Sequence, residues 1–322
     1  MPNLVRHDAR HTRDATAAAI PVPNLVLPGP SKTGTTSLFW YLAQHREVCR
    51  SSTKETLHFT PLSETEADAD GRLPSLADYR GYFLHYAGER YLMESSPRYF
   101  HGGPRLAAGL AATLPDVRVL VTLRDPVTRT WSLFRYAKSR FFVPAEQTFE
   151  EYVEHCAALD AAGAPQTAAN RPYWSFPGGR YADYLPAWLE ALPPGRVRVV
   201  FFEQMVGDVP GTLRGICAWL GIDAGQVADW DLTVQNRSNQ YRHGALQRLA
   251  VAANHERLLR NHRTLKRPLR AAYYAVNGRR RERPMRLETR RRLDHTFADP
   301  NRRLRAQLVG LGYTNLPAWL DV

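Results

Sequence analysis

The amino-acid sequence predicts an α/β protein with a parallel β-sheet flanked by helices. Short β-branched runs alternate with segments of helical periodicity, which is the pattern of βαβ units. Two of the runs, VRVLVTL and RVRVVFF, are apolar enough to be strands buried inside a sheet. A loop rich in Gly, Ser and Thr joins the first run to the first helical segment, so the expected order here is strand, loop and helix.

The expected elements follow one another in a regular order. We expect strands at residues 24–28, 90–93, 117–123 and 196–202. We expect helices at residues 35–44, 127–140, 181–192 and 210–220. The last helix should end at Gly221, because glycine is the commonest residue just after a helix. Two polar segments, residues 63–75 and 159–179, are expected to be surface loops, and the second is long enough to be functional.

Size and composition indicate a single domain. The chain of 322 residues is long enough for one large α/β domain, which we expect at residues 23–322. Residues 1–22 have no apolar core of the signal-peptide kind, so we expect a flexible lead-in and a cytoplasmic protein. The 3 cysteines are scattered, and they form neither a disulfide framework nor a zinc-ligand spacing, so we expect no bound metal.

The charge balance indicates an anionic ligand or partner. The formal net charge is +12, and residues 242–305 hold 19 of the 43 basic residues, so we expect a basic C-terminal helical portion at about 242–322. No nucleic-acid-binding motif or aromatic stacking pattern accompanies these arginines, so we expect no nucleic-acid partner. Contact with an acidic membrane surface remains an alternative for residues 255–276, although Pro268 interrupts this basic stretch.

The loop after the first expected strand has the composition of a phosphate-binding loop. It reads PGPSKTGTTSL. Gly29 and Gly34 let the backbone approach an anion closely, and the N–H groups at the start of the following helix point toward it. Thr35, Thr36 and Ser37 add hydroxyl donors. These residues therefore predict a site for a phosphate or a similar anion.

The lysine of this loop is displaced. In nucleotide triphosphatases a lysine follows the second glycine, and the next Ser or Thr binds magnesium. Here Thr35 follows the second glycine, and Lys32 lies two positions before that glycine. A P-loop nucleotide or small-molecule kinase is therefore the less favoured alternative, and dependence on magnesium would distinguish it.

The same loop resembles the 5′-phosphosulfate loop of sulfotransferases that use 3′-phosphoadenosine 5′-phosphosulfate (PAPS), most closely the carbohydrate-type and bacterial branch. The resemblance implies a P-loop-nucleotide-kinase-like sulfotransferase fold and a donor site without metal. It implies donor binding by Lys32, Thr33, Gly34, Thr35, Thr36 and Ser37. It also gives Lys32 a catalytic role, since a compact ammonium is suited to neutralising charge on the leaving bridging oxygen.

A second motif extends the resemblance. The segment VRVLVTLRDPVTRTWSLFRY is an apolar strand that leads into R-D-P-V-x-R-x-x-S, where the family holds the donor's 3′-phosphate. The corresponding ligands here are Arg124 and Ser132. Independently of the family, arginine binds phosphate in a bidentate manner and Pro126 suits the first turn of a helix. Arg129 either adds to the phosphate site or pairs with a carboxylate.

A basic run near the C-terminus is the third candidate for donor binding. GRRRERP, residues 278–284, falls where relatives have a basic loop over the 3′-phosphate. The resemblance makes Arg281 and Arg283 candidates, and a solvated charge run remains an equal alternative.

The expected general base comes from another segment. STKETLHFT, residues 52–60, resembles the K-E-x-H-F segment of carbohydrate-type members, in which the Glu is the base. The resemblance implies that Glu55 is the base. However, Thr56 and Leu57 separate Glu55 from His58, where relatives usually have one residue. His58 therefore remains the second choice, because histidine is the base in the phenol- and steroid-type branch.

A further cleft segment departs from the family pattern. YLMESSPRYF resembles E-K-[TS]-P-x-Y, but Ser95 stands where many members have a lysine. Arg98 either replaces that lysine or pairs with Glu94. Taken together, the motifs predict an enzyme that moves a sulfuryl group from PAPS, by in-line displacement, to a hydroxyl of a carbohydrate-containing or small natural-product acceptor.

Overall fold

The protein is built on a five-stranded parallel sheet with the strand order β2-β3-β1-β4-β5. The computed structural model describes residues 20–233, 246–248, 273, 276–277 and 284–321. The strands are β1 Leu25–Gly29, β2 Val48–Arg50, β3 Tyr91–Glu94, β4 Arg118–Leu123 and β5 Val197–Phe201. The predicted α/β fold with a parallel sheet is therefore confirmed.

Strand β2 is the one described strand that the sequence analysis missed. It has only 3 residues, of which Val48 and Cys49 are buried, and it pairs on one side only, with β3. A strand this short carries too few residues to show a periodic pattern. The other four strands begin and end within one residue of their expected bounds.

Helices connect the strands and cover both faces of the sheet. They are α2 Thr35–Leu42, α3 Leu76–Arg80, α4 Gly103–Thr113, α5 Pro126–Ser139, α6 Phe149–Ala161, α7 Leu185–Ala191, α8 Phe202–Gly207, α9 Val209–Leu220 and α12 Leu287–Gly310. The helix expected at 181–192 is divided into a 3-10 turn, Tyr181–Asp183, and α7. Gly221 follows α9 in the left-handed conformation with φ 70°, as predicted. Among the described residues, no helix is long and apolar enough to span a bilayer.

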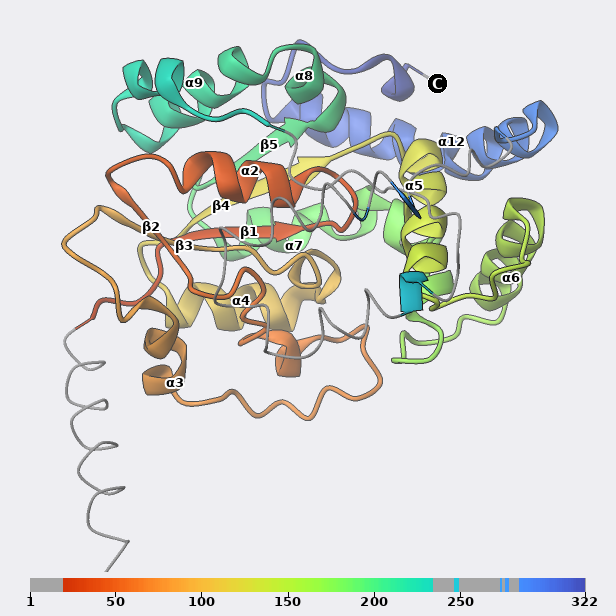
Figure 1. The fold of residues 1–322 in the computed structure, drawn as a ribbon, viewed down its shortest axis with the longest axis horizontal. Coiled ribbons are helices and arrows are strands. Elements are labelled where there is room, and N and C mark those ends of the chain that lie inside the picture. The colour runs from red at the N-terminus through yellow and green to blue at the C-terminus, as the bar shows by residue number, and fades with distance from the viewer. Residues whose placement is uncertain (1–19, 234–245, 249–272, 274–275, 278–283, 322) are drawn as a thin grey trace, which may run out of the picture.

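The two faces of the sheet pack against different helices. Figure 1 shows α2 and α9 above the sheet and α4 below it. Val119, Val121 and Leu123 of β4 belong to the core cluster that includes α4, α7 and α12. Leu120, between them, belongs to the cluster with α2 and α9. This alternation is the period of two expected for a strand that is buried on both faces.

The strand order places a binding crevice beside β1. The chain runs from β1 to β2 and β3 on one side, and then crosses to β4 and β5 on the other. In open parallel sheets, ligands bind at the carboxyl ends of the strands, where the winding changes direction. The loops after β1, β3, β4 and β5 therefore meet at one edge of the sheet.

The two ends of the chain are described only in part. Residues 1–19 of the expected lead-in lie outside the described residues, whereas Ile20 is already buried against β2 and β3. Most of the basic stretch between 242 and 283 also lies outside them, and this includes Arg281 and Arg283. The described part of the basic C-terminal portion is mainly the 24-residue helix α12, which agrees with the expected helical character.

Candidate functional site

A cleft of about 660 Å³ lies at the carboxyl ends of the strands. It is lined by residues that follow each of four strands: Ser31 after β1, Pro97 after β3, Arg124 after β4 and Phe202 after β5. Its volume is in the range of pockets that bind small molecules. The cleft therefore lies where the topology of the sheet places a binding site.

The loop between β1 and α2 needs its two glycines. Gly29 and Gly34 have φ values of 109° and 92°. A Cβ at Gly29 would lie 2.5 Å from the Pro97 carbonyl oxygen, and one at Gly34 would lie 2.5 Å from Met205 Cε. Within the described chain, no side chain caps the first turn of α2, which begins at Thr35. The N–H groups of this turn are therefore available to bind an anion in the cleft.

The loop residues differ in how they face the cleft. Of the loop residues predicted to bind the donor, those that line the cleft are Lys32, Gly34, Thr35, Thr36 and Ser37. The side chain of Thr33 is fully buried, and its hydroxyl contacts Thr122 Oγ1 at 2.6 Å. This hydroxyl joins the loop to β4, so any contribution of Thr33 to donor binding must come from its backbone, and that contribution stays a prediction.

Lys32 lies in a crowded cationic environment. Its backbone has φ 71°, and its Nζ lies 4.4 Å from the centre of the Tyr136 ring. Burial, followed by the nearby charges of Arg124 and Arg135, lowers the pKa of Lys32 to about 8. An anion bound in the cleft would offset both effects, since it would favour the charged ammonium.

Arg124 joins the second motif to the loop. Its Nη1 donates to the Lys32 carbonyl at 3.2 Å, and its Nε donates to Thr128 Oγ1 at 3.2 Å. Its guanidinium lies 4.3 Å from the centre of the Phe202 ring. Both Arg124 and Ser132 line the cleft, so the two motifs predicted to bind phosphates meet there.

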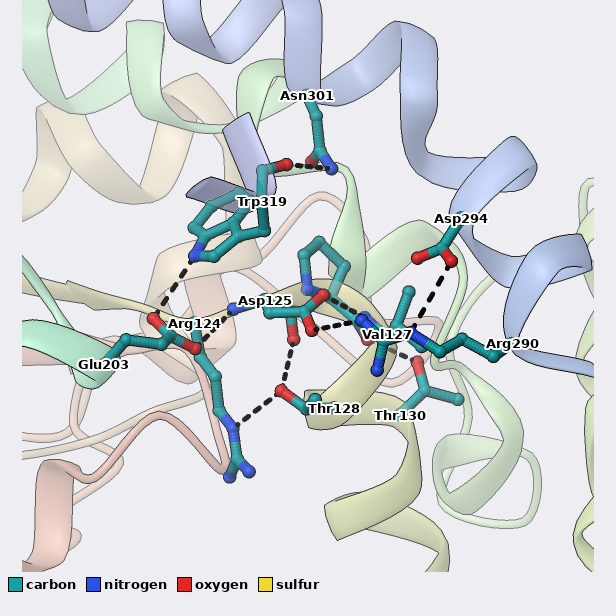
Figure 2. A network of polar contacts seen from close by, with 11 residues as sticks. Arg124, Asp125, Val127, Thr128, Thr130, Glu203, Arg290, Asp294, Asn301 and Trp319 are labelled. Atoms are coloured by element: carbon teal, nitrogen blue, oxygen red, sulfur yellow. Dashed lines mark hydrogen bonds and ion pairs between the residues drawn. The ribbon is translucent and has the colours of Figure 1, made fainter. Parts of the chain in front are cut away.

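A polar network behind Arg124 holds the start of α5 (Figure 2). Asp125 Oδ1 accepts from the Val127 N–H at 2.9 Å, and the Asp125 N–H donates to Glu203 Oε1 at 3.0 Å. The other oxygen of Glu203 accepts from Trp319 Nε1 at 3.2 Å. Figure 2 shows the guanidinium of Arg124 turned away from Glu203 and Trp319. The carboxylate of Asp125 therefore serves as a helix cap and does not line the cleft.

Arg129 holds the loop from its other side. Its side chain is buried, its Nε donates to the Ser31 carbonyl at 3.0 Å, and its Nη1 donates to the Ser175 carbonyl at 3.4 Å. No carboxylate partner of Arg129 is found among the described residues. Arg129 also lines the cleft, so its charge acts on the loop between β1 and α2.

The two candidates for the general base lie in different environments. Glu55 lines the cleft, its side chain is 49% exposed, and its carboxylate lies 3.3 Å from Lys54 Nζ. His58 is buried and does not line the cleft. Its ring stacks on Tyr79 with centroids 4.2 Å apart, and burial lowers its pKa to about 4. This location argues against His58 as the base, because a general base must lie within hydrogen-bond reach of a hydroxyl bound in the cleft.

The arrangement of Glu94 and Arg98 corrects one expectation. Glu94 is fully buried and accepts hydrogen bonds from Tyr79, Thr56 and Ser96 at 2.7–3.0 Å. Arg98 pairs with Glu66. The alternative that Arg98 pairs with Glu94 is therefore wrong, because Glu94 points into a cage of hydroxyls while Arg98 lines the cleft. Burial raises the pKa of Glu94, and the hydrogen bonds from Ser96 and Thr56 oppose this.

Several lining residues were not singled out by sequence reasoning. The loop 159–179 contributes Gln166, Arg171 and Trp174 to the cleft wall, and α5 contributes Tyr136. The only signal for the loop was its length. The described residues contain no cluster of three His, Cys, Asp or Glu side chains that could hold a metal, and a site without metal stays a prediction.

Comparisons with known proteins agree with this geometry. A family model described as "Sulfotransferase domain" matches residues 23–249. The bifunctional heparan sulfate N-deacetylase/N-sulfotransferase 3 of Homo sapiens is 26% identical over 212 residues, which are 62% of this chain and 22% of that protein. The heparan sulfate glucosamine 3-O-sulfotransferase 3B1 of Mus musculus is 30% identical over 202 residues, which are 62% of this chain and 46% of that protein. The chain thus spans less than half the length of either relative.

A solved structure supports the fold over almost the whole chain. The crystal structure of a sulfotransferase from Alicyclobacillus acidocaldarius has a TM-score of 0.64 and 22% sequence identity, and the match covers 93% of this chain and 99% of that one. At this identity the likeness supports the fold alone.

Proposed function

Because the chain belongs to the sulfotransferase domain family, which matches it at residues 23–249, we propose that it transfers a sulfuryl group from PAPS to a hydroxyl group. The proposed acceptor is a carbohydrate-containing compound or a small natural product. The observation that carries the proposal is the hydrogen bond between Arg124 and the Lys32 carbonyl, because it brings both phosphate motifs to one cleft.

The charge of the cleft suits ligands with several negative charges. Its described lining includes six cationic side chains and one carboxylate, that of Glu55. The six are Lys32, Lys54, Arg98, Arg124, Arg129 and Arg171. The uncapped start of α2 adds N–H donors for the phosphosulfate end, and Arg124 and Ser132 add donors for the 3′-phosphate.

The reaction needs three contributions from the protein. The donor supplies a sulfuryl group with a good leaving group. In our proposal Glu55 removes the proton of the acceptor hydroxyl, and Lys32 neutralises the negative charge on the bridging oxygen. The loop, α2 and Arg124 hold the reacting groups in line, so positioning and electrostatics provide most of the rate enhancement.

The glycan part of the acceptor proposal is supported by the printed names of the two heparan sulfate relatives. It extends to this chain only as a proposal, since identity is low and coverage is partial. A cytoplasmic location and a single domain over residues 23–322 are also proposals, which cell fractionation and limited proteolysis would test.

Two measurements test the proposed function. Calorimetry with adenosine 3′,5′-bisphosphate should show one binding site per chain without added magnesium. Transfer of labelled sulfate from PAPS to an acceptor panel should then proceed in EDTA. A P-loop kinase would instead need magnesium and would bind ATP in preference to the bisphosphate.

A further inference from the structure

Two surface loops, far apart in the sequence, are joined beside the cleft. Residues 63–75 and 159–179 meet in an isolated parallel bridge between Glu66 and Gln166. The Ala67 N–H donates to the Gln166 carbonyl at 2.9 Å, and the Gln166 N–H donates to the Thr65 carbonyl at 2.9 Å. The first loop therefore anchors the second, which forms one wall of the cleft.

A buried carboxylate at this junction is shared by two arginines. The side chain of Glu66 is 1% exposed. Arg98 holds it with two hydrogen bonds, one of them from Nε at 2.8 Å, and Arg171 Nη2 lies 3.5 Å from Glu66 Oε2. Both arginines line the cleft, whereas Glu66 does not. Glu66 therefore orients two guanidinium groups toward the space of the cleft.

The junction has an unbalanced positive charge. The carboxylates of Glu66 and Glu55 face three cations, those of Arg98, Arg171 and Lys54, so one positive charge is not neutralised. Burial and the neighbouring charge of Arg171 lower the pKa of Arg98 to about 10, which reflects the same imbalance. The buried Nε of Arg171 has no hydrogen-bond partner in the described part of the chain. An anion bound between the two guanidinium groups would supply acceptor atoms to them.

The position of this charge separates it from the donor site. Strands β3 and β4 flank β1 on opposite sides. Arg98 follows β3 and Arg124 follows β4, so the two arginines approach the loop after β1 from opposite sides. Arg98 is also close enough to Glu55 for the Glu55 charge to act on it. The Arg98–Glu66–Arg171 cluster therefore belongs to the side of the cleft that holds the proposed base.

We propose that Arg98 and Arg171, oriented by Glu66, form an anion-binding subsite for the acceptor. The acceptor accordingly carries a carboxylate or sulfate group near the hydroxyl that is modified. Arginine pairs well with both groups because its N–H donors match two oxygens at once. This inference rests on the proposed function, since it assigns the acceptor of the same reaction.

A matched pair of sugars tests the subsite. The enzyme is saturated with adenosine 3′,5′-bisphosphate and titrated in a calorimeter with 4-nitrophenyl β-D-glucuronide or 4-nitrophenyl β-D-xyloside. The two sugars share three ring hydroxyls, and the xyloside lacks the carboxylate. We expect the glucuronide to bind on the order of tenfold more tightly, the effect of one charge-assisted hydrogen bond.

Two variants identify the residues responsible. Arg171→Gln should remove most of this preference and leave xyloside binding unchanged. Arg180→Gln is the matched control, because Arg180 pairs with Asp160, follows the same loop and does not line the cleft. It should keep the preference of the wild-type protein. If Arg171→Gln fails to fold, the salt dependence of the wild-type preference replaces it, and the preference should fall as salt rises.

The outcomes separate this inference from the proposed function. If adenosine 3′,5′-bisphosphate binds, the subsite is overturned when both sugars bind equally or when neither binds. It is also overturned when the glucuronide preference survives in Arg171→Gln or does not depend on salt. Failure of the bisphosphate itself to bind overturns both proposals.

Discussion

The two sides of the cleft are held in place by different means. On the proposed donor side, Lys32 and Arg124 lie within three residues of the ends of β1 and β4, and the Arg124 side chain contacts the Lys32 carbonyl. On the proposed acceptor side, Arg98 and Arg171 are held by the carboxylate of Glu66, which belongs to a loop. A rigid sheet edge thus supports one side, and two loops joined by ion pairs support the other.

This difference has a functional meaning. Sites on regular elements are held more firmly than sites on loops, and loops tolerate sequence change more easily. A fixed donor site combined with a loop-built acceptor site allows related enzymes to keep one donor and change the acceptor. The comparison predicts that substitutions on the two sides will affect different measured quantities.

The largest effect is expected from Glu55→Gln. The amide cannot accept the acceptor proton, so kcat should fall by about 10³, within the usual range for loss of a general base. Adenosine 3′,5′-bisphosphate should bind as before, since Glu55 is on the acceptor side. Turnover with labelled PAPS and calorimetry measure the two quantities.

A matched variant addresses the second candidate for the base. His58→Phe preserves the ring that stacks on Tyr79, so it should retain most of the activity. Full activity of Glu55→Gln together with an inactive His58→Phe protein would reverse the assignment of the base.

Arg124→Gln should affect the donor side. The loss of a bidentate phosphate ligand should weaken binding of adenosine 3′,5′-bisphosphate by roughly 30-fold. Within the described residues, the half-buried Arg196 side chain pairs only with Asp116, at the opposite end of the strands, so Arg196→Gln should not change this affinity. Equal affinities of Arg124→Gln and the wild-type protein would remove Arg124 from the donor site.

The same contrast explains what the sequence analysis could predict. Gly29, Gly34 and Arg124 are next to strands, so strand prediction alone brings their loops to one edge of the sheet. The pairing of Arg98 with Glu66 joins residues 32 positions apart, and nothing local selects this partner. The nearby Glu94 was one of the two alternatives for Arg98. That pairing does not form, because the chain leaves β3 between Glu94 and Arg98 and the two side chains point to different places.

Two other side chains, those of His58 and Thr33, also lie where the sequence alone does not place them. The extra residue before His58 accompanies a left-handed turn at Leu57, with φ 57°, and His58 lies inside the core. The hydroxyl of Thr33 bonds to β4 although its neighbours face the cleft. In a loop without a repeating pattern, the direction of each side chain depends on tertiary contacts that the sequence does not display.

A smaller effect is expected from pH on the donor side. In the free protein Lys32 has a pKa lowered to about 8, and a bound anion should raise it. Binding should therefore be strongest below pH 8 and should weaken above it, because the lysine must then take up a proton. Between pH 7 and pH 9 the affinity for adenosine 3′,5′-bisphosphate should fall by about tenfold. Lys32→Arg stays charged, so its affinity should not vary over this range.

The smallest effect is expected from Glu66→Gln on the acceptor side. Loss of the shared carboxylate leaves two arginines without their partner, but both are partly exposed, so solvent compensates for much of the loss. We expect a loss of about 1 kcal/mol, which corresponds to a melting temperature lower by about 2 °C. Hydrogen exchange should become faster in residues 63–75 and 159–179, while the affinity for adenosine 3′,5′-bisphosphate stays the same.

The control is Glu64→Gln, because Glu64 is an exposed neighbour of Glu66, and this variant should leave hydrogen exchange unchanged. Faster exchange in the loop after β1, or weaker binding of the bisphosphate, would mean that the two sides of the cleft are coupled and that the contrast between them is incorrect.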